Sequence, residues 1–186
     1  MTTSSAWYTE VGPATAVTQG DLIDSCPVIE WDSEVERGAQ DLKAATRAAT
    51  QDVIVMTQAC DLEHGKVENV LLCPRAKLSE YRQAWESDQR TKGQTPIPKS
   101  WGKHCDNIRD GFVWNLGLLD ATPSGEVVVV DFHEVFTVPR RFLDSFLREQ
   151  NKPRLRLSSP YREHLSQAFA RFFMRVGLPV SVTKAW

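Results

Sequence analysis

The chain has 186 residues, of which 41% are hydrophobic and 25% charged, and its formal net charge at pH 7 is −2. These values are typical of a soluble globular protein. No apolar run approaches the roughly 20 residues that a membrane-spanning helix needs, and the first residues resemble no signal peptide. We therefore expect a cytoplasmic protein without membrane contact. The four cysteines form no Cys-x-x-Cys pair and are expected to be reduced thiols.

The charge is unevenly distributed along the chain. Residues 139–186 contain ten Lys or Arg and three acids, a net of +7, and the remainder therefore carries −9. A basic end on an acidic body can bind nucleic acid or an acidic protein. The alternative is that the two parts neutralise each other inside the fold, and the sequence leaves both open.

The N-terminal part of the chain is predicted to contain extended segments. Residues 1–18 show little periodicity and indicate an irregular lead-in. Residues 22–23 follow turn residues and predict a first strand. Residues 26–31 are expected to be extended because Pro27 disfavours a helix before it. Residues 32–51 are compatible with either a helix or a loop.

Residues 52–74 form the centre of the predicted fold. Two runs rich in β-branched residues, Val53–Met56 and Val70–Cys73, indicate strands that are buried on both faces. The polar segment between them is predicted to be the turn of a hairpin. It contains the densest cluster of reactive side chains in the chain: Thr57, Gln58, Cys60, Asp61, Glu63 and His64.

Residues 78–111 are predicted to be a helical insertion between strands. Helical spacing of apolar residues extends over 78–90. Residues 91–103 contain Gly and Pro and predict a loop, and 101–109 predicts a short helix. Insertions of this kind often contact partners or substrates. Three aromatic side chains are expected to be exposed there for binding: Tyr81, Trp85 and Trp101.

The second half of the chain predicts further strands and a short helix. Strands over 112–121 and 126–132 are expected to pair as a hairpin. Residues 135–138 continue as strand, and 140–150 suits a helix. Leucines alternate with arginines over 154–158, as in a half-buried strand.

A C-terminal helix is predicted over 160–176. Its apolar stripe has helical spacing and consists of Leu165, Ala168, Phe169, Phe172, Phe173 and Val176. Arg171 and Arg175 lie four residues apart and repel each other unless an anion is near. They can contact phosphates, or they can belong to a solvated polar face.

The order of these segments resembles the PemK/MazF toxin family. The chain has a Gln-Gly-Asp strand opening at 19–23, an apolar strand ending in Thr57, and a strand ending in Pro74. A Val-Asp strand end at 129–131 then leads to a basic, apolar segment at 140–143. The resemblance implies a barrel of SH3-like type that is closed by a C-terminal helix, and it implies RNA as a substrate.

One departure from the family bears on activity. The ribonucleases of this family carry an Arg directly before the second strand, where this chain reads Ala-Thr-Gln-Asp52 and Arg47 lies five residues upstream. Segments 57–63 and 159–173 also look like a group of uncharacterised small bacterial proteins. That likeness suggests accessory proteins of stress or defence systems, including CRISPR loci.

The sequence does not favour a zinc site. Its ligands would be Cys60, His64 and Cys73 with His104 or Cys105, but the spacing matches no common zinc pattern. Neither a metal nor another cofactor is therefore expected. A Cys60 nucleophile with His64 as its base is disfavoured, because the flanking acids would raise the pKa of the thiol.

The sequence thus predicts one α+β domain over 1–186: a small, partly open, SH3-like β-barrel with strands in 19–77 and 112–158, an insertion at 78–111 and a helix at 160–176. The leading hypothesis is a non-catalytic accessory protein that engages a protein partner; a homodimer is also possible. The candidate binding residues are Gln58, Cys60, Asp61, Tyr81, Trp85, Trp101, Arg171 and Arg175. The alternative is a metal-independent endoribonuclease with Asp61, His64 and Arg162 as candidate catalytic residues.

Overall fold

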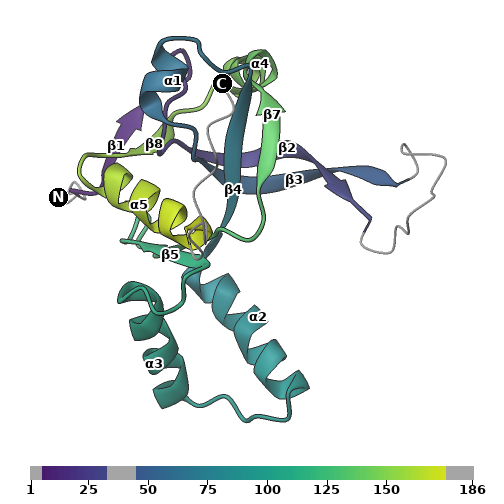
Figure 1. The fold of residues 1–186 in the computed structure, drawn as a ribbon, viewed down its shortest axis with the longest axis vertical. Helices are drawn as coiled ribbons and strands as arrows, with labels where there is room; N and C mark the ends of the chain where they lie inside the picture. Colours follow the sequence, from purple (N-terminus) through teal and green to yellow (C-terminus); the bar gives the residue numbers. More distant parts are fainter. Residues whose placement is uncertain (1–5, 33–44, 175–186) are drawn as a thin grey trace, which may run out of the picture.

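The computed structural model describes residues 6–32 and 45–174, which form an α+β fold (Figure 1). The strands are β1 Tyr8–Val11, β2 Leu22–Trp31, β3 Thr46–Val55, β4 Asn69–Lys77, β5 Leu116–Leu119, β6 Val128–Asp131, β7 Phe136–Pro139 and β8 Arg154–Leu157. The helices are α1 Ala59–Glu63, α2 Leu78–Thr91, α3 Pro98–Arg109, α4 Arg140–Gln150 and α5 Tyr161–Phe173.

Strand β4 is the centre of the main sheet. All pairings in the sheet are antiparallel, in the order β2-β3-β4-β6-β5, and β7 also pairs with β4. The first half of β4 pairs with β7 and the second half with β6, while β3 occupies the other edge. Strands β1 and β8 form a separate two-stranded sheet. No pairing among the described strands closes the main sheet into a barrel.

Strands β3 and β4 are buried on both faces along the apolar runs Val53–Val55 and Val70–Cys73, as these runs predict. Val53 and Val55 pack on one side with Leu143 and Leu147 of α4. Ile54 packs on the other side, in a cluster that also holds Phe132, Leu157 and Leu165. Because side chains alternate along a strand, one continuous apolar run supplies both cores, and α4 and α5 cover opposite sides.

The buried carboxylate of Asp21 joins the start of β2 to β8. Asp21 is 0% exposed. Arg154 Nε donates to Asp21 Oδ2 at 2.8 Å, and Arg156 donates to both carboxylate oxygens. Arg154 also donates to the carbonyls of Gly12, Thr15 and Ala16. Asp21, Arg154 and Arg156 form a charged triad, in which each charge has a partner. Burying one of these charges without a partner would be costly.

A strand forms at Arg154–Leu157, as the alternation of leucines and arginines predicts, but its arginine side is partly buried. Arg154 is only 7% exposed, because its partner Asp21 lies inside the fold, and Leu157 is 1% exposed. The irregular lead-in was wrong in part, since β1 pairs with β8 in the register Tyr8↔Leu157 to Val11↔Arg154. Both differences come from contacts between distant parts of the chain.

Several predicted boundaries shift in the structure. A short helix, α1, replaces the simple turn predicted between β3 and β4. Helix α3 begins at Pro98, inside the predicted loop. Strand β5 is only four residues long. Strand β3 extends back to Thr46 because it pairs with β2, and the rest of the ambiguous 32–51 segment (33–44) lies outside the described residues.

Candidate functional site

Strands β2 and β3 extend beyond the sheet as a two-stranded ribbon, which we call the arm (Figure 1). The arm consists of Cys26–Trp31 paired with Thr46–Gln51. Over the described residues no third strand pairs with either segment. A bulge between Ile23 and Cys26 marks its base, and Ser25 adopts a φ of 49° there. Bulges bend a strand, and this one lies where the arm leaves the sheet.

One face of the arm carries no charge. Alternation and register place six side chains on this face: Pro27, Ile29, Trp31, Thr46, Ala48 and Thr50. Ile29 is 69% exposed and Trp31 is 63% exposed. Isolated two-stranded ribbons are marginally stable in water, and large exposed apolar side chains on such a ribbon are typical of an interaction surface.

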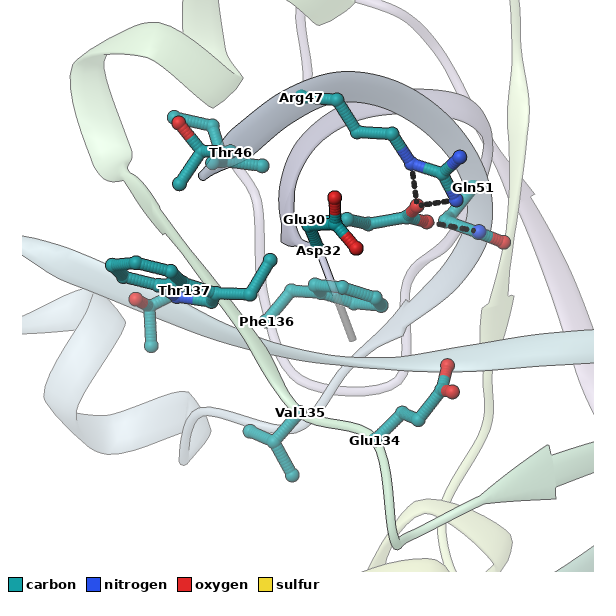
Figure 2. A pocket seen from close by; sticks show the side chains of 11 residues that line it. Glu30, Asp32, Thr46, Arg47, Gln51, Glu134, Val135, Phe136 and Thr137 are labelled. Atoms are coloured by element: carbon teal, nitrogen blue, oxygen red, sulfur yellow. Dashed lines mark hydrogen bonds and ion pairs between the residues drawn. The ribbon is translucent and has the colours of Figure 1, made fainter. Parts of the chain in front are cut away.

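The opposite face of the arm carries the buried Cys26 and Val28 and a group of polar side chains that bond to one another. Gln51 Nε2 donates to Glu30 Oε1 at 2.7 Å, and Arg47 Nη2 donates to Glu30 Oε2 at 2.7 Å (Figure 2). The hydrogen bonds from Gln51 and Arg47 lower the pKa of Glu30. Because Arg47 is 76% exposed and Glu30 17%, this pair orients side chains more than it stabilises the fold.

The arm and the segment that leads into β7 enclose a groove of about 920 Å3, which we call the arm groove. Its lining consists of Ile29, Glu30, Trp31, Asp32, Thr46, Arg47, Gln51, Glu134, Val135, Phe136 and Thr137. Figure 2 shows Glu134, Val135 and Phe136 across from the Glu30 cluster. Three acids and one Arg line the groove, and that Arg is already bonded to Glu30. The groove therefore combines apolar surface with net negative charge.

The reactive cluster of the sequence lies on α1, away from the arm groove lining. Gln58 is the N-cap of α1, and His64 is its C-cap. Cys60 is exposed, and Asp61 Oδ1 lies 3.8 Å from Lys66 Nζ. Leu62 anchors α1 in the core at 1% exposure. The cluster is thus a surface helix, and no contact found here assigns it a reaction.

The three aromatic residues of the insertion pack against one another across α2 and α3. Trp85 and Trp101 have ring centroids 5.3 Å apart, and Tyr81 and Trp101 are separated by 6.1 Å. All three are half-buried, contrary to their expected exposure. His104 completes the cluster, with Nε2 2.9 Å from the Tyr81 hydroxyl. These rings hold the two helices together.

The predicted catalytic residues of the ribonuclease hypothesis are spread over two elements. Arg162 lies on α5 and its Nη2 donates to Glu163 Oε1 at 2.8 Å. Within the described residues no hydrogen bond or ion pair joins Arg162 to Asp61 or His64. Arg171 lies on α5 as predicted, and Arg175 lies outside the described residues.

All four cysteines are free thiols. Cys73 is 0% exposed, and burial raises the pKa of its thiol to about 12. Cys60 and His64 lie on or next to α1, whereas His104 and Cys105 belong to α3. Across residues 6–32 and 45–174 no three His, Cys, Asp or Glu side chains gather as a metal site would require.

The arm groove was not among the sites predicted from the sequence. The alternation of Ile29 and Trp31 with Glu30 and Asp32 was a usable signal, but it does not reveal which face a sheet would leave uncovered. That face became visible only with the pairing of β2 and β3.

Comparisons of the chain with protein-family models, curated proteins and solved structures return no match. None of the helices in the described part of the chain has the length and apolar character needed to span a membrane.

Proposed function

We propose that this protein is a non-catalytic accessory protein that binds a protein partner in the arm groove. The observation that supports the proposal is the uncharged face of the arm, where Ile29 and Trp31 are 69% and 63% exposed beside a groove of about 920 Å3. Exposed Trp side chains are common among the few residues that carry most of the binding energy of an interface.

The lining of the groove favours a particular kind of partner segment. Glu30, Asp32 and Glu134 outnumber the single Arg47, so complementary charge belongs to Lys or Arg. The apolar wall of Ile29, Trp31 and Val135 favours one or two apolar anchors between them. The proposed occupant is therefore an extended segment that presents apolar side chains flanked by basic ones.

The resemblance to the PemK/MazF family suggests a fold relation and a cellular role. We propose that the main sheet is a partly open relative of the SH3-like barrel and that the protein acts in the cytoplasm, in a bacterial stress or defence system. The Gln-Gly-Asp segment supports this, because Asp21 is the buried centre of the triad that joins β2 to β8. The insertion 78–111, expected to be the interface, supplies a second surface to test.

A test compares partner recovery by variants of the arm with recovery by a matched control. The double variant Ile29→Asp, Trp31→Ala should lower recovery at least about tenfold, an effect of about 1.4 kcal/mol. Its stability should change by no more than about 0.5 kcal/mol per site, because both side chains are exposed. Phe142→Ala is the control, since Phe142 is 44% exposed on α4 and does not line the groove.

Native mass spectrometry of protein purified from its host identifies the partner for this experiment. If the arm variant recovers as much partner as the wild type, the arm groove is not the interface. If only a variant with 79–110 replaced by a flexible linker loses the partner, the interface belongs to the insertion. If no partner is recovered with the wild type, the accessory function is contradicted.

Endoribonuclease activity is the second candidate, and one observation favours it. The side chain of Arg75, on β4, lies beside Asp24 and Asp52, and Asp52 belongs to the segment of β3 where the family's Arg is missing. These three residues line a groove of about 460 Å3. A carboxylate can act as general base, and a guanidinium can stabilise charge on phosphate. Cleavage of single-stranded RNA that Arg75→Ala abolishes would support this candidate, and RNA left intact by the wild type would eliminate it.

A further inference from the structure

A second groove, unrelated to the arm, lies between α5 and β5. Its volume is about 270 Å3, just below the roughly 300–1,000 Å3 of sites for drug-sized ligands. We call it the α5 groove. Its lining comprises Trp7, Ile108, Arg109, Gly111, Val113, Trp114, Leu116, Gly117, Leu118, Leu119, Tyr161, His164, Leu165, Ala168 and Arg171. The size fits a small molecule or a single unit of a polymer.

Aromatic rings and apolar side chains form much of this groove. Trp7 and Tyr161 stack with their ring centroids 4.0 Å apart and an angle of 14° between the rings. Trp114 also lines the groove and is 45% exposed. Leu116, Leu119 and Leu165 are buried lining residues. A flat aromatic ligand finds both stacking partners and an apolar surface here.

The charged side chains of the α5 groove have a single sign. Arg109 and Arg171 are part of the lining, and none of the lining residues is an acid. The three other grooves found among the described residues each include at least one carboxylate. An aromatic ligand that also carries negative charge is therefore complementary to this groove.

Arg171 is the cation best placed to bind the charge. An added Cβ on Gly111 would lie 3.0 Å from Arg171 Nη2, so the guanidinium rests directly against that glycine, which has a φ of +75°. No carboxylate among the described residues pairs with Arg171, whereas Arg109 is bound to Asp106 and Asp110. Arg171 thus retains its hydrogen-bond donors for a ligand, and a guanidinium matches a phosphate in geometry.

We propose that the α5 groove binds a nucleoside monophosphate unit, with the base on the aromatic lining and the phosphate on Arg171. The guanidinium of Arg171, in a groove lined by no acid, attracts a dianionic phosphate more strongly than a singly charged carboxylate. The unit is either a free nucleotide or the 5′-phosphorylated end of a single-stranded RNA. This proposal is independent of protein binding in the arm groove.

Isothermal titration calorimetry of the full chain tests the proposal with AMP, UMP, adenosine and inorganic phosphate. AMP or UMP should bind at least about tenfold more tightly than adenosine, because the charge-assisted bond to Arg171 is missing in the nucleoside. Inorganic phosphate alone should bind more weakly than either nucleotide. Absence of nucleotide binding at millimolar concentration overturns the proposal.

Two variants separate the two parts of the site. Arg171→Ala should weaken AMP binding at least about tenfold and leave adenosine binding unchanged, and Arg171→Lys should recover part of the loss. Trp114→Ala should weaken the binding of AMP and the binding of adenosine by a similar factor. The expected factor is about five- to hundredfold, because one stacking contact is lost. If Arg171→Ala leaves AMP binding unchanged, the proposal fails.

The control is Arg148→Ala, which removes an exposed Arg of α4 that lines none of the four grooves. If Arg148→Ala loses as much AMP binding as Arg171→Ala, AMP is attracted nonspecifically to a basic surface and the proposal is overturned. A short single-stranded RNA with a 5′-phosphate, compared with the same RNA without it, distinguishes the two sources. Displacement of AMP only by the phosphorylated RNA identifies the RNA end as a ligand, and displacement by neither RNA identifies the free nucleotide.

Discussion

At the scale of single residues, the fold depends on one buried carboxylate. Asp21 is 0% exposed and is bonded to Arg154, itself 7% exposed, and to Arg156. An Asp beside a Gly is commonly a turn residue, and nothing in the local sequence distinguishes this one. Its burial follows from the position of β8, more than 130 residues further along the chain.

Asp21→Asn should therefore lower the free energy of unfolding by about 3–5 kcal/mol, because it leaves the Arg154 guanidinium buried without a counter-charge. Urea unfolding followed by circular dichroism measures the change. Arg47→Ala is the control: it removes an ion pair whose Arg is 76% exposed, and its effect should stay within about 1 kcal/mol. Equal losses in the two variants would contradict the role of the buried triad.

At the scale of elements, the α2–α3 hairpin is held together by an aromatic cluster that contains a titratable group. The ring centroid of His104 lies 5.3 Å from that of Trp85 and 5.8 Å from that of Tyr81. Burial lowers the pKa of His104, and burial also raises the pKa of Tyr81 to about 12. Both shifts favour the neutral side chains inside the cluster.

The hairpin should accordingly lose stability in acid. The unfolded chain protonates His104 near its ordinary pKa of about 6.5, whereas the folded hairpin resists protonation, so the contribution is present above that pH and is lost as the pH falls through the folded-state pKa. Hydrogen exchange of the α2 and α3 amides, measured above and below about pH 6.5, reports this loss. His104→Gln should abolish the pH dependence, and His64→Gln, at the exposed cap of α1, should leave it intact. Retention of the pH dependence in His104→Gln would refute the assignment.

At the scale of the whole molecule, the C-terminal segment completes the core. Leu157 of β8 and Leu165 of α5 are 1% and 4% exposed, and both belong to the cluster that contains Ile54 and Phe132. The α2–α3 hairpin, by contrast, contributes to a smaller cluster around Ile108. The two segments therefore differ in how much of the fold depends on them.

A chain truncated after Gln150 should show no cooperative thermal transition, because it loses several large buried side chains at about 1.5–3 kcal/mol each and the partners of Asp21. A chain with 79–110 replaced by a flexible linker should retain a cooperative transition at a lower temperature. Differential scanning calorimetry compares them. A cooperative transition in the truncated chain would show that the C-terminal segment is dispensable.

The elements that could be predicted from the amino-acid sequence are those with local signals. The runs Val53–Met56 and Val70–Cys73 were predicted to be strands buried on both faces, and β3, which ends at Val55, and β4 contain them. Helix α4 spans the predicted 140–150. Both signals consist of neighbouring residues. The α+β class and the β5–β6 hairpin follow from the same kind of signal.

Which polar and aromatic side chains are buried, and which surfaces are exposed, depends on the packing of distant segments and could not be predicted from the sequence. Trp101 packs against the aromatic rings of α2, whereas Trp31 is 63% exposed on the arm. The α5 groove combines Trp7, Trp114 and Arg171, which are far apart in the chain. Such differences depend on pairing and packing between distant segments, for which a local pattern carries no information.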